Sequence, residues 1–501
     1  MAAGSQYGFF APGLKVNLVT TPDGSNLPLG ISGEFNIELV TAPNGTSFNV
    51  AFSKGYQSAA LLPGGTGQSV QLLAGNFGVY DTGTGDAITL LSNGAQTVVG
   101  GKSDTITGGS GNDLINALAT MELVTAGSGA TTIWGGIGDT IAGANGTVLI
   151  DGSAGSQLIS GGTGQSIILG GAGDTITGTG GVGASTIVGA AGDTIAGGFG
   201  SDLINGLLGS QSITGGGGST TVWGGAGDTI AGGAGAALID AMSGNQRITG
   251  GPGSSTILGG IGDTITGSTG SGGSVIVGSK NNTIAGGSGS DLINGLAGSQ
   301  SITGGSGSTT VWGGAGDTIT AGSGAILVAG QAGDTVTGGS GSGTILGSLG
   351  SQKITGGTGT TGGYTIVGGA ADTITAGSGA DLINGLAGSQ SITGGSGNAT
   401  VWGGPGDTIT GAAGQLTVDI DQANFPGAER VGDSGIAGNT SVTGFSQSAG
   451  DRIFFPNETT ASINSVVASA QTSNGNTVIT LPDGGTMTLV NITKIDSTFF
   501  G

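Results

Sequence analysis

The stretch Asp228-Thr229-Ile230-Ala231-Gly232-Gly233-Ala234-Gly235-Ala236 decides the fold, and residues 300–308 (QSITGGSGS) repeat its pattern. An aliphatic residue stands third and a glycine-rich segment follows. Because side chains alternate between the two faces of a strand, Ile230 should point inward, with Thr229 and Ala231 pointing outward. Glycine is favoured where the chain must turn with positive φ. Each such stretch therefore predicts half a turn of a coil, made of one short strand and one corner.

One column of polar residues recurs along the chain at intervals of 17 to 20 residues. Its nineteen members are carboxylates or amides: Asp86, Asp104, Glu122, Asp139, Gln157, Asp174, Asp193, Gln211, Asp228, Gln246, Asp263, Asn282, Gln300, Asp317, Asp334, Gln352, Asp372, Gln390 and Asp407. A fixed period of this kind is typical of a repeat architecture in which each turn stacks on the previous one. We therefore predict an all-β fold, a parallel β-solenoid of the β-roll or β-helix kind with about 17–18 residues per turn.

A longer repeat is superimposed on the turns. The sequence Asp-Leu-Ile-Asn begins at Asp113, Asp202, Asp291 and Asp381, at spacings of 89, 89 and 90 residues. The four tryptophans of the chain keep the same spacings: Trp134, Trp223, Trp312 and Trp402. Ten half-turns fill one block, so a block contains five turns and should rise about 24 Å at ~4.8 Å per stacked strand.

Composition divides the chain into three segments. Residues 65–414 form the glycine-rich solenoid, whereas residues 1–64 and 415–501 are richer in aromatic residues and proline. Residues 35–39 (FNIEL) and 48–52 (FNVAF) alternate like antiparallel strands. Because open solenoid ends invite pairing with other chains, we predict that residues 1–64 are a β-rich N-terminal cap and assembly domain. Residues 415–501 are predicted to form the C-terminal cap.

Composition also excludes several functions. The chain has no Cys and no His, which excludes disulfides and nucleophiles activated by His. A net charge of −21 with nine Lys and Arg argues against nucleic acid as a partner. No apolar stretch is long enough to span a bilayer, and the first residues lack the features of a cleaved signal peptide. The tight turns leave no room for the loops that wall a catalytic cleft, so we do not expect an enzyme.

The nonapeptide Gly-Gly-x-Gly-x-Asp-x-U-x, where U is a large aliphatic residue, occurs at residues 108–116, 197–205 and 286–294, with a near match at 376–384. At these residues the chain resembles the repeats-in-toxin (RTX) family of β-roll proteins. Residues 450–453, 476–484, 489–492 and 499–500 resemble the C-terminal module of type I secretion substrates. The resemblance implies calcium binding at such turns and export by a C-terminal signal, hence a secreted or cell-surface location.

Two interpretations of the acidic residues remain open. Most corners read Gly-Gly-x-Gly-Asp, one residue shorter than the nonapeptide, and Gln or Asn interrupts the column. In the first interpretation, the column is a polar ladder that needs no calcium, in which stacked amides bond to one another. Alternatively, calcium is a cofactor at a few turns, around Asp113, Asp202, Asp291 and Asp381.

Two outward-facing features are candidates for recognition. The four tryptophans should lie on one face, where exposed indoles suggest lateral contacts; local packing over the glycine corner is the alternative. The other face carries Thr-x-Thr pairs such as Thr264 and Thr266, interrupted by Arg247 and Lys353. Such a flat array resembles ice-binding solenoids, although Thr also simply suits exposed strands.

The sequence thus favours a secreted structural protein that assembles with itself at the cell surface or in the extracellular matrix, as an S-layer or filament. A cell-surface polysaccharide is a further candidate partner. The alternative function is an ice-binding or surface-adhesion solenoid that uses the Thr-x-Thr face.

Overall fold

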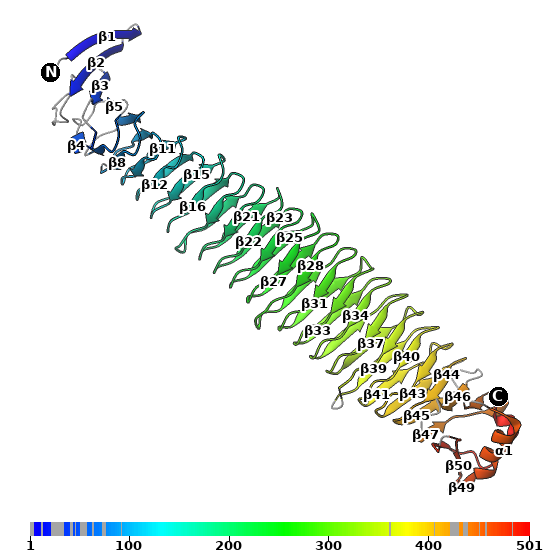
Figure 1. Cartoon of the computed structure of the whole chain (residues 1–501). Coiled ribbons are helices and arrows are strands. Elements are labelled where there is room, and N and C mark those ends of the chain that lie inside the picture. The colour runs from blue at the N-terminus through cyan, green and yellow to red at the C-terminus, as the bar shows by residue number, and fades with distance from the viewer. Residues whose placement is uncertain are drawn as a thin grey trace. The chain divides into compact units, whose positions relative to one another are not determined.

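The structure is a computed structural model of the 501-residue chain (Figure 1). It describes residues 5–11, 14–21, 35–40, 44–45, 47–50, 58–62, 65–72, 77–91, 93–359, 362–404, 406–420, 430–433, 439–449, 451–455, 458–482 and 484–501. The chain divides into two compact units, Met1–Gly253 and Ser254–Gly501. Each unit is built of solenoid turns, as the period predicted, and together they contain about 20 turns of ~18 residues.

Each turn of the first unit contributes one strand to each of two parallel sheets. Sheet A contains the longer strands: β7 (Phe77–Asp81), β9 (Thr97–Val99), β11 (Asp113–Ala117), β13 (Thr131–Gly135), β15 (Val148–Gly152), β17 (Ser166–Gly170), β19 (Ser185–Val188), β21 (Asp202–Gly206), β23 (Thr220–Gly224) and β25 (Ala237–Ala241). Sheet B contains β6 (Ser69–Leu72), β8 (Ala87–Leu90), β10 (Thr105–Thr107), β12 (Leu123–Thr125), β14 (Thr140–Ala142), β16 (Leu158–Ser160), β18 (Thr175–Thr177), β20 (Thr194–Ala196), β22 (Ser212–Thr214), β24 (Thr229–Ala231) and β26 (Arg247–Thr249).

The second unit repeats this plan. Its sheet A contains β27 (Ser255–Gly259), β29 (Ser274–Val277), β31 (Asp291–Gly295), β33 (Thr309–Gly313), β35 (Ile326–Ala329), β37 (Gly343–Gly347), β39 (Tyr364–Gly368), β41 (Asp381–Asn384), β43 (Ala399–Gly403), β45 (Gln415–Ile420) and β47 (Asn439–Thr443). Its sheet B contains β28 (Thr264–Thr266), β30 (Thr283–Ala285), β32 (Ser301–Thr303), β34 (Thr318–Thr320), β36 (Thr335–Thr337), β38 (Lys353–Thr355), β40 (Thr373–Thr375), β42 (Ser391–Thr393), β44 (Thr408–Gly411), β46 (Arg430–Asp433) and β48 (Arg452–Phe454).

The core of each unit is a stack of aliphatic side chains from both sheets. In sheet B the third residue of each half-turn is buried, as predicted: Ile141, Ile176 and Ile230 in the first unit, and Ile265, Ile319 and Ile409 in the second, are at most 1% exposed. The parallel register places each of these residues on its counterpart one turn away, for example Ile230 on Ile248. The residues on either side of them in the strand point outward, as the period of two requires.

The corner glycines are needed for two different physical reasons. Gly227 precedes the column residue Asp228 and has φ +77°, which a side chain would penalise. Gly200 serves the contact between turns, because a Cβ there would overlap the carbonyl oxygen of Gly183 one turn away. The sequence argument predicted positive φ, but close stacking of consecutive corners adds an equally strong demand for glycine.

The N-terminal strands continue the parallel stacking rather than forming a separate antiparallel sheet. β3 (Phe35–Val40) pairs in parallel with β2 (Leu14–Thr21) and β5 (Ser58–Leu62), and β4 (Ser47–Val50) pairs in parallel with β6. β1 (Ser5–Ala11) and β2 are antiparallel. The prediction that residues 35–39 and 48–52 form antiparallel strands is therefore wrong for the part that the structure describes, because alternation reveals a strand but not the direction of its partner.

The C-terminal segment closes the second unit with a small mixed structure. β51 (Thr486–Leu489) adds in parallel to β47 and pairs antiparallel with β50 (Asn476–Thr480), which also pairs with β49 (Gln471–Ser473). The single α-helix of the described chain, α1 (Thr460–Ser469), starts with a capping box. Two short 3₁₀ helices, η1 (Gln447–Ala449) and η2 (Ser497–Phe499), complete the segment.

Aromatic contacts hold the chain end against this cap. Phe499 stacks on Phe445 with ring centroids 5.8 Å apart, and Phe500 meets Phe455 edge-on at 6.0 Å. Offset and edge-to-face geometries are favourable for aromatic pairs. No helix in the described residues has the length and apolarity needed to cross a bilayer.

Candidate functional site

The column of acidic and amide residues lies inside the solenoid, at the start of each sheet B strand. Asp228 precedes β24, and its carboxylate is 1% exposed. Its Oδ1 accepts the backbone N–H of Gln211, one turn back, at 2.8 Å. Its Oδ2 accepts the N–H of Gly225, in its own corner, at 2.7 Å. One carboxylate therefore satisfies two backbone donors, one from each of two consecutive turns.

This pair of hydrogen bonds recurs through both units. The aspartates that accept one N–H from the previous turn and one from their own corner are Asp104, Asp139, Asp174, Asp193, Asp317, Asp334, Asp372 and Asp407. Asp263 accepts the N–H of Gly260 in the same way, at 2.7 Å. Because buried backbone donors must be paired, the column supplies acceptors that the corners lack.

The glutamines of the column fit corners that are one residue longer. The corner at residues 206–210 (GLLGS) precedes Gln211, whereas the corner at 224–227 (GGAG) precedes Asp228. The Gln211 Nε2 donates to the carbonyl of Gly206 at 3.0 Å, and Gln300 and Gln390 make the same bond to Gly295 and Gly385. The predicted bonding between stacked amides is not the arrangement found here. Five glutamines instead donate to the backbone of their own corner: Gln157, Gln211, Gln246, Gln300 and Gln390.

Burial shifts the titration of the column. Desolvation raises the pKa of Asp334 and of Asp407 to about 6, and the neighbouring Asp317 carboxylate raises that of Asp334 further. The backbone N–H groups that each carboxylate accepts act in the opposite direction and limit the rise. Two aspartates therefore change charge in the folded protein near pH 6, well above their ordinary range near 4.

We expect the solenoid to be more stable at pH 5 than at pH 8 in the presence of a chelator. A carboxylate whose pKa is raised on folding binds its proton more tightly in the folded state. Its contribution is therefore complete below about pH 4 and is lost as pH rises through about 6. The two groups should change the free energy of unfolding by a few kcal/mol, since one pKa unit corresponds to about 1.4 kcal/mol. Urea unfolding at both pH values measures this difference.

The matched control is the double variant Asp334→Asn, Asp407→Asn. Asn282 already occupies one position of the column, where its Oδ1 accepts the N–H of Asp263 at 2.9 Å, so an amide is compatible with the ladder. The double variant should lose the part of the difference that these two groups contribute, about 3 kcal/mol. The remainder should persist, because burial raises the pKa of Asp81 to about 8 and that of Glu122 to about 9. If the double variant shows the same stability difference between pH 5 and pH 8 as the parent chain, Asp334 and Asp407 do not contribute to it.

The nonapeptide aspartates occupy the equivalent place in sheet A. Asp202 begins β21, and its carboxylate accepts the N–H of Ser185 at 3.0 Å and of Gly198 at 2.6 Å. Asp291 makes the same pair of bonds to Ser274 and Gly287, and Asp381 makes it to Tyr364 and Gly377. Asp113 accepts the N–H of Gly109 at 2.8 Å. These carboxylates hold backbone donors, so calcium at these turns would have to use their remaining lone pairs.

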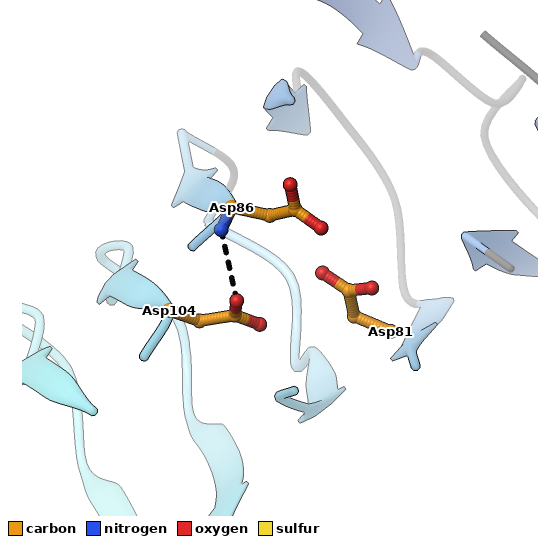
Figure 2. A group of neighbouring side chains, drawn as sticks. All are labelled: Asp81, Asp86 and Asp104. Atoms are coloured by element: carbon orange, nitrogen blue, oxygen red, sulfur yellow. Dashed lines mark hydrogen bonds between the residues drawn. The ribbon is translucent and has the colours of Figure 1, made fainter. Parts of the chain in front are cut away.

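A third group of carboxylates was not recognised as a cluster from the sequence. Ligand oxygens of Asp81, Asp86 and Asp104 all lie within 4.8 Å of one another, and all three residues are buried. Figure 2 shows Asp86 and Asp104 on successive turns, with Asp81 facing them. Burial raises the pKa of Asp81, and the negative charges of Asp104 and Asp86 add to the shift. The signal in the sequence was an aspartate at the end of β7, where later turns have Gly or Ala.

The tryptophans lie on the outer face of sheet A, as the period predicted. Trp134 and Trp223 in the first unit, and Trp312 and Trp402 in the second, are 37–42% exposed. Trp223 lines a shallow hollow with Gly224 of its own corner and with Leu207 and Met242 from the corners of the preceding and following turns. On sheet B, both outward residues of β18, β22, β32 and β34 are exposed Ser or Thr.

Six segments of the chain match the sequence family described as the RTX calcium-binding nonapeptide repeat: residues 94–119, 187–222, 223–257, 240–272, 276–311 and 366–401. These segments include all four nonapeptide aspartates. Repeats of this family bind calcium. No curated protein matches the chain.

Proposed function

Because the chain is an RTX-repeat protein with a parallel β-solenoid fold, we propose that it is a secreted structural protein that assembles with copies of itself. The assembly would form at the cell surface or in the extracellular matrix, as an S-layer or a filament. Calcium is the proposed cofactor at a few turns, and a cell-surface polysaccharide is a further candidate partner. The proposal includes no enzymatic activity and no nucleic-acid partner. Export would use the C-terminal segment, whose resemblance to type I secretion substrates supports this part.

The observation that carries the proposal is the apolar outer face of sheet A. In the first unit this face presents Trp134, Leu149, Ile167, Leu169 and Leu238, each 37–47% exposed. In the second unit the exposed apolar residues of the face are Val275, Val277, Trp312, Leu327 and Trp402. Regular rows of exposed large apolar side chains are unusual on monomeric proteins and mark interaction surfaces.

Charge favours this face over the rest of the surface for contact between copies. The chain carries −21, so two copies repel wherever acidic surfaces meet. Among the outward residues of the sheet A strands β11 to β43, two are charged, Asp151 and Asp240. The same residue types return every five turns, so a second copy displaced by one block meets the same surface. In such a displaced contact, one block of a chain meets a different block of the next chain, so the contact does not close on itself and can propagate as a filament or sheet.

The test replaces the four tryptophans together by asparagine. Asn205 and Asn294 occupy the same position of their strands as Trp223 and Trp312, with which they are paired in register, so asparagine is compatible with the fold. We expect a folded monomer whose threshold concentration for assembly rises at least ~10-fold, equivalent to about 1.4 kcal/mol per contact. Light scattering and electron microscopy measure assembly, and circular dichroism confirms the fold.

The matched control carries four Thr→Asn substitutions on sheet B, at Thr175, Thr264, Thr318 and Thr373. This variant should assemble like the parent chain, because its changes lie on the other sheet. If the sheet B variant loses assembly while the tryptophan variant keeps it, the proposed surface is wrong. Ice-growth inhibition that disappears in the sheet B variant alone would instead support the alternative function, in which the Thr-x-Thr face binds ice or another surface.

A further inference from the structure

The first complete turns of the solenoid differ from all later turns in their buried charge. Asp86, Asp104, Glu122 and Asp139 follow one another in the column without an amide between them, whereas later acidic runs contain at most two residues. Asp81 adds a fifth carboxylate from sheet A. Glycine or alanine stands at the equivalent position in every turn from Ala117 to Gly403. An acidic side chain therefore occupies a corner position that carries glycine or alanine in the regular turns that follow.

Several oxygen atoms in this region have no hydrogen-bond donor. Asp81 Oδ2 and Asp86 Oδ2 are buried without a partner, although Asp81 Oδ1 accepts the N–H of Gly83 at 2.6 Å. In Asp104, and in column aspartates of later turns such as Asp139 and Asp228, both carboxylate oxygens are paired with N–H groups. The shared role of the column therefore does not account for the free oxygens of Asp81 and Asp86.

The space next to Gly83 is lined by oxygen. A Cβ on Gly83 would come close to Asp86 Oδ2, to Asp81 Oδ1 and to the carbonyl oxygen of Gly65. Because Gly83 has no side chain, a small space remains between two carboxylates and a backbone carbonyl. Asp104 supplies a third carboxylate within 4.8 Å of the others (Figure 2).

Glu122 is a further buried carboxylate one turn along the column. Its side chain is 1% exposed, and neither carboxylate oxygen has a hydrogen-bond partner. One of these oxygens lies where a Cβ on Gly100 would stand, and Gly100 follows Val99, which is paired with Tyr80 beside Asp81. A further unpaired buried carboxylate therefore lies one turn beyond Asp81, at the place that a glutamine Oε1 occupies in several later turns.

We propose that Asp81, Asp86 and Asp104, with the carbonyl of Gly65, bind one calcium ion inside the N-terminal turns, at a site separate from the nonapeptide turns. The ligand set contains oxygen atoms alone, which suits a hard divalent cation. Calcium accepts an irregular set of carboxylates and carbonyls, whereas magnesium requires near-octahedral geometry. The ion would neutralise the clustered charge and link sheet A to sheet B where the regular turns begin. This inference does not depend on the proposed assembly.

The test compares calcium binding by the full chain with binding by Asp81→Ala and Asp81→Asn. Alanine already stands at this position in another turn, as Ala117, so the first variant should fold. The asparagine variant keeps an oxygen that can accept the N–H of Gly83. Titration calorimetry of metal-stripped protein with calcium chloride should count one ion fewer in each variant, or bind it at least ~10-fold more weakly. Calcium should also raise the Tm of the parent by more than it raises that of either variant.

Asp228→Asn serves as the matched control, because the position equivalent to Asp81 in its turn is Gly224, so no carboxylate from sheet A faces Asp228. It should bind as many calcium ions as the parent chain. If the Asp81 variants bind the same number of ions with the same affinity as the parent, the proposed site does not exist. If they are more stable than the parent without calcium and gain no less from it, the cluster is held by protons, which also overturns the proposal.

Discussion

Replacing Ile265 by aspartate is expected to unfold the turns around it in the second unit. Ile265 is 1% exposed in β28 and lies in register with Ile284 of the next turn. Its Cδ1 fills the space beside Gly259, on the opposite sheet. A carboxylate there would be buried without a partner, two residues from the inward-facing Asp263. Burying an unpaired charge costs several kcal/mol, a large part of the 5–15 kcal/mol that stabilises an ordinary domain.

The control for this prediction is Thr264→Asp, one residue earlier in the same strand. Thr264 points outward and is exposed, so its substitution should change the free energy of unfolding by about 0.5 kcal/mol or less. Thermal melting by circular dichroism and limited proteolysis should distinguish the two variants clearly. If both melt like the parent chain, the strand register and the interior position of Ile265 are wrong.

The regular part of the fold could be predicted because the residue pattern of each half-turn determines its own strand and corner. Ile230 and its equivalents fix which face is inside, and a shift of one residue would turn every one of them outward. The long block marked by Trp134 and Asp113 fixed the equivalence of strands that are far apart in sequence. Periodicity of this kind depends on backbone geometry alone, and so the core, the two sheets and the outward tryptophans could be read from it.

The rest depended on contacts that periodicity does not encode. The direction of β3 and β4 follows from their partners, which the alternation of their residues cannot identify. The hydrogen bond from Gln211 to Gly206 depends on a corner that is one residue longer. It could not be predicted without the backbone conformation of that corner. Asp81 was missed because it is 5 residues before Asp86 in sequence and belongs to another strand. Its approach to the column is set by how the chain crosses from sheet A to sheet B.

Replacing Asp228 by alanine should destabilise the first unit more than any single change to its outer surface. The carboxylate accepts N–H groups from Gln211 and Gly225, at 2.8 and 2.7 Å, and alanine offers no acceptor to either. An unpaired buried donor costs about 1–3 kcal/mol, so the loss should be about 2–6 kcal/mol. Asp228→Asn should lose about half as much, because its oxygen can still accept one N–H group, as Asn282 does. Urea unfolding of the three proteins measures the series.

The same series decides how the ladder is stabilised. If the column aspartates act as acceptors for backbone donors, the ranking Asp, Asn, Ala and its spacing should be the same in calcium and in chelator. The parent chain in chelator should also keep the β-sheet signal of its turns, because these bonds need no ion. If the difference between Asp228 and its variants disappears in chelator, the carboxylate acts through bound calcium instead. The ladder would then be an extension of the calcium-binding repeats, and the nonapeptide turns and the column would form one calcium-dependent structure.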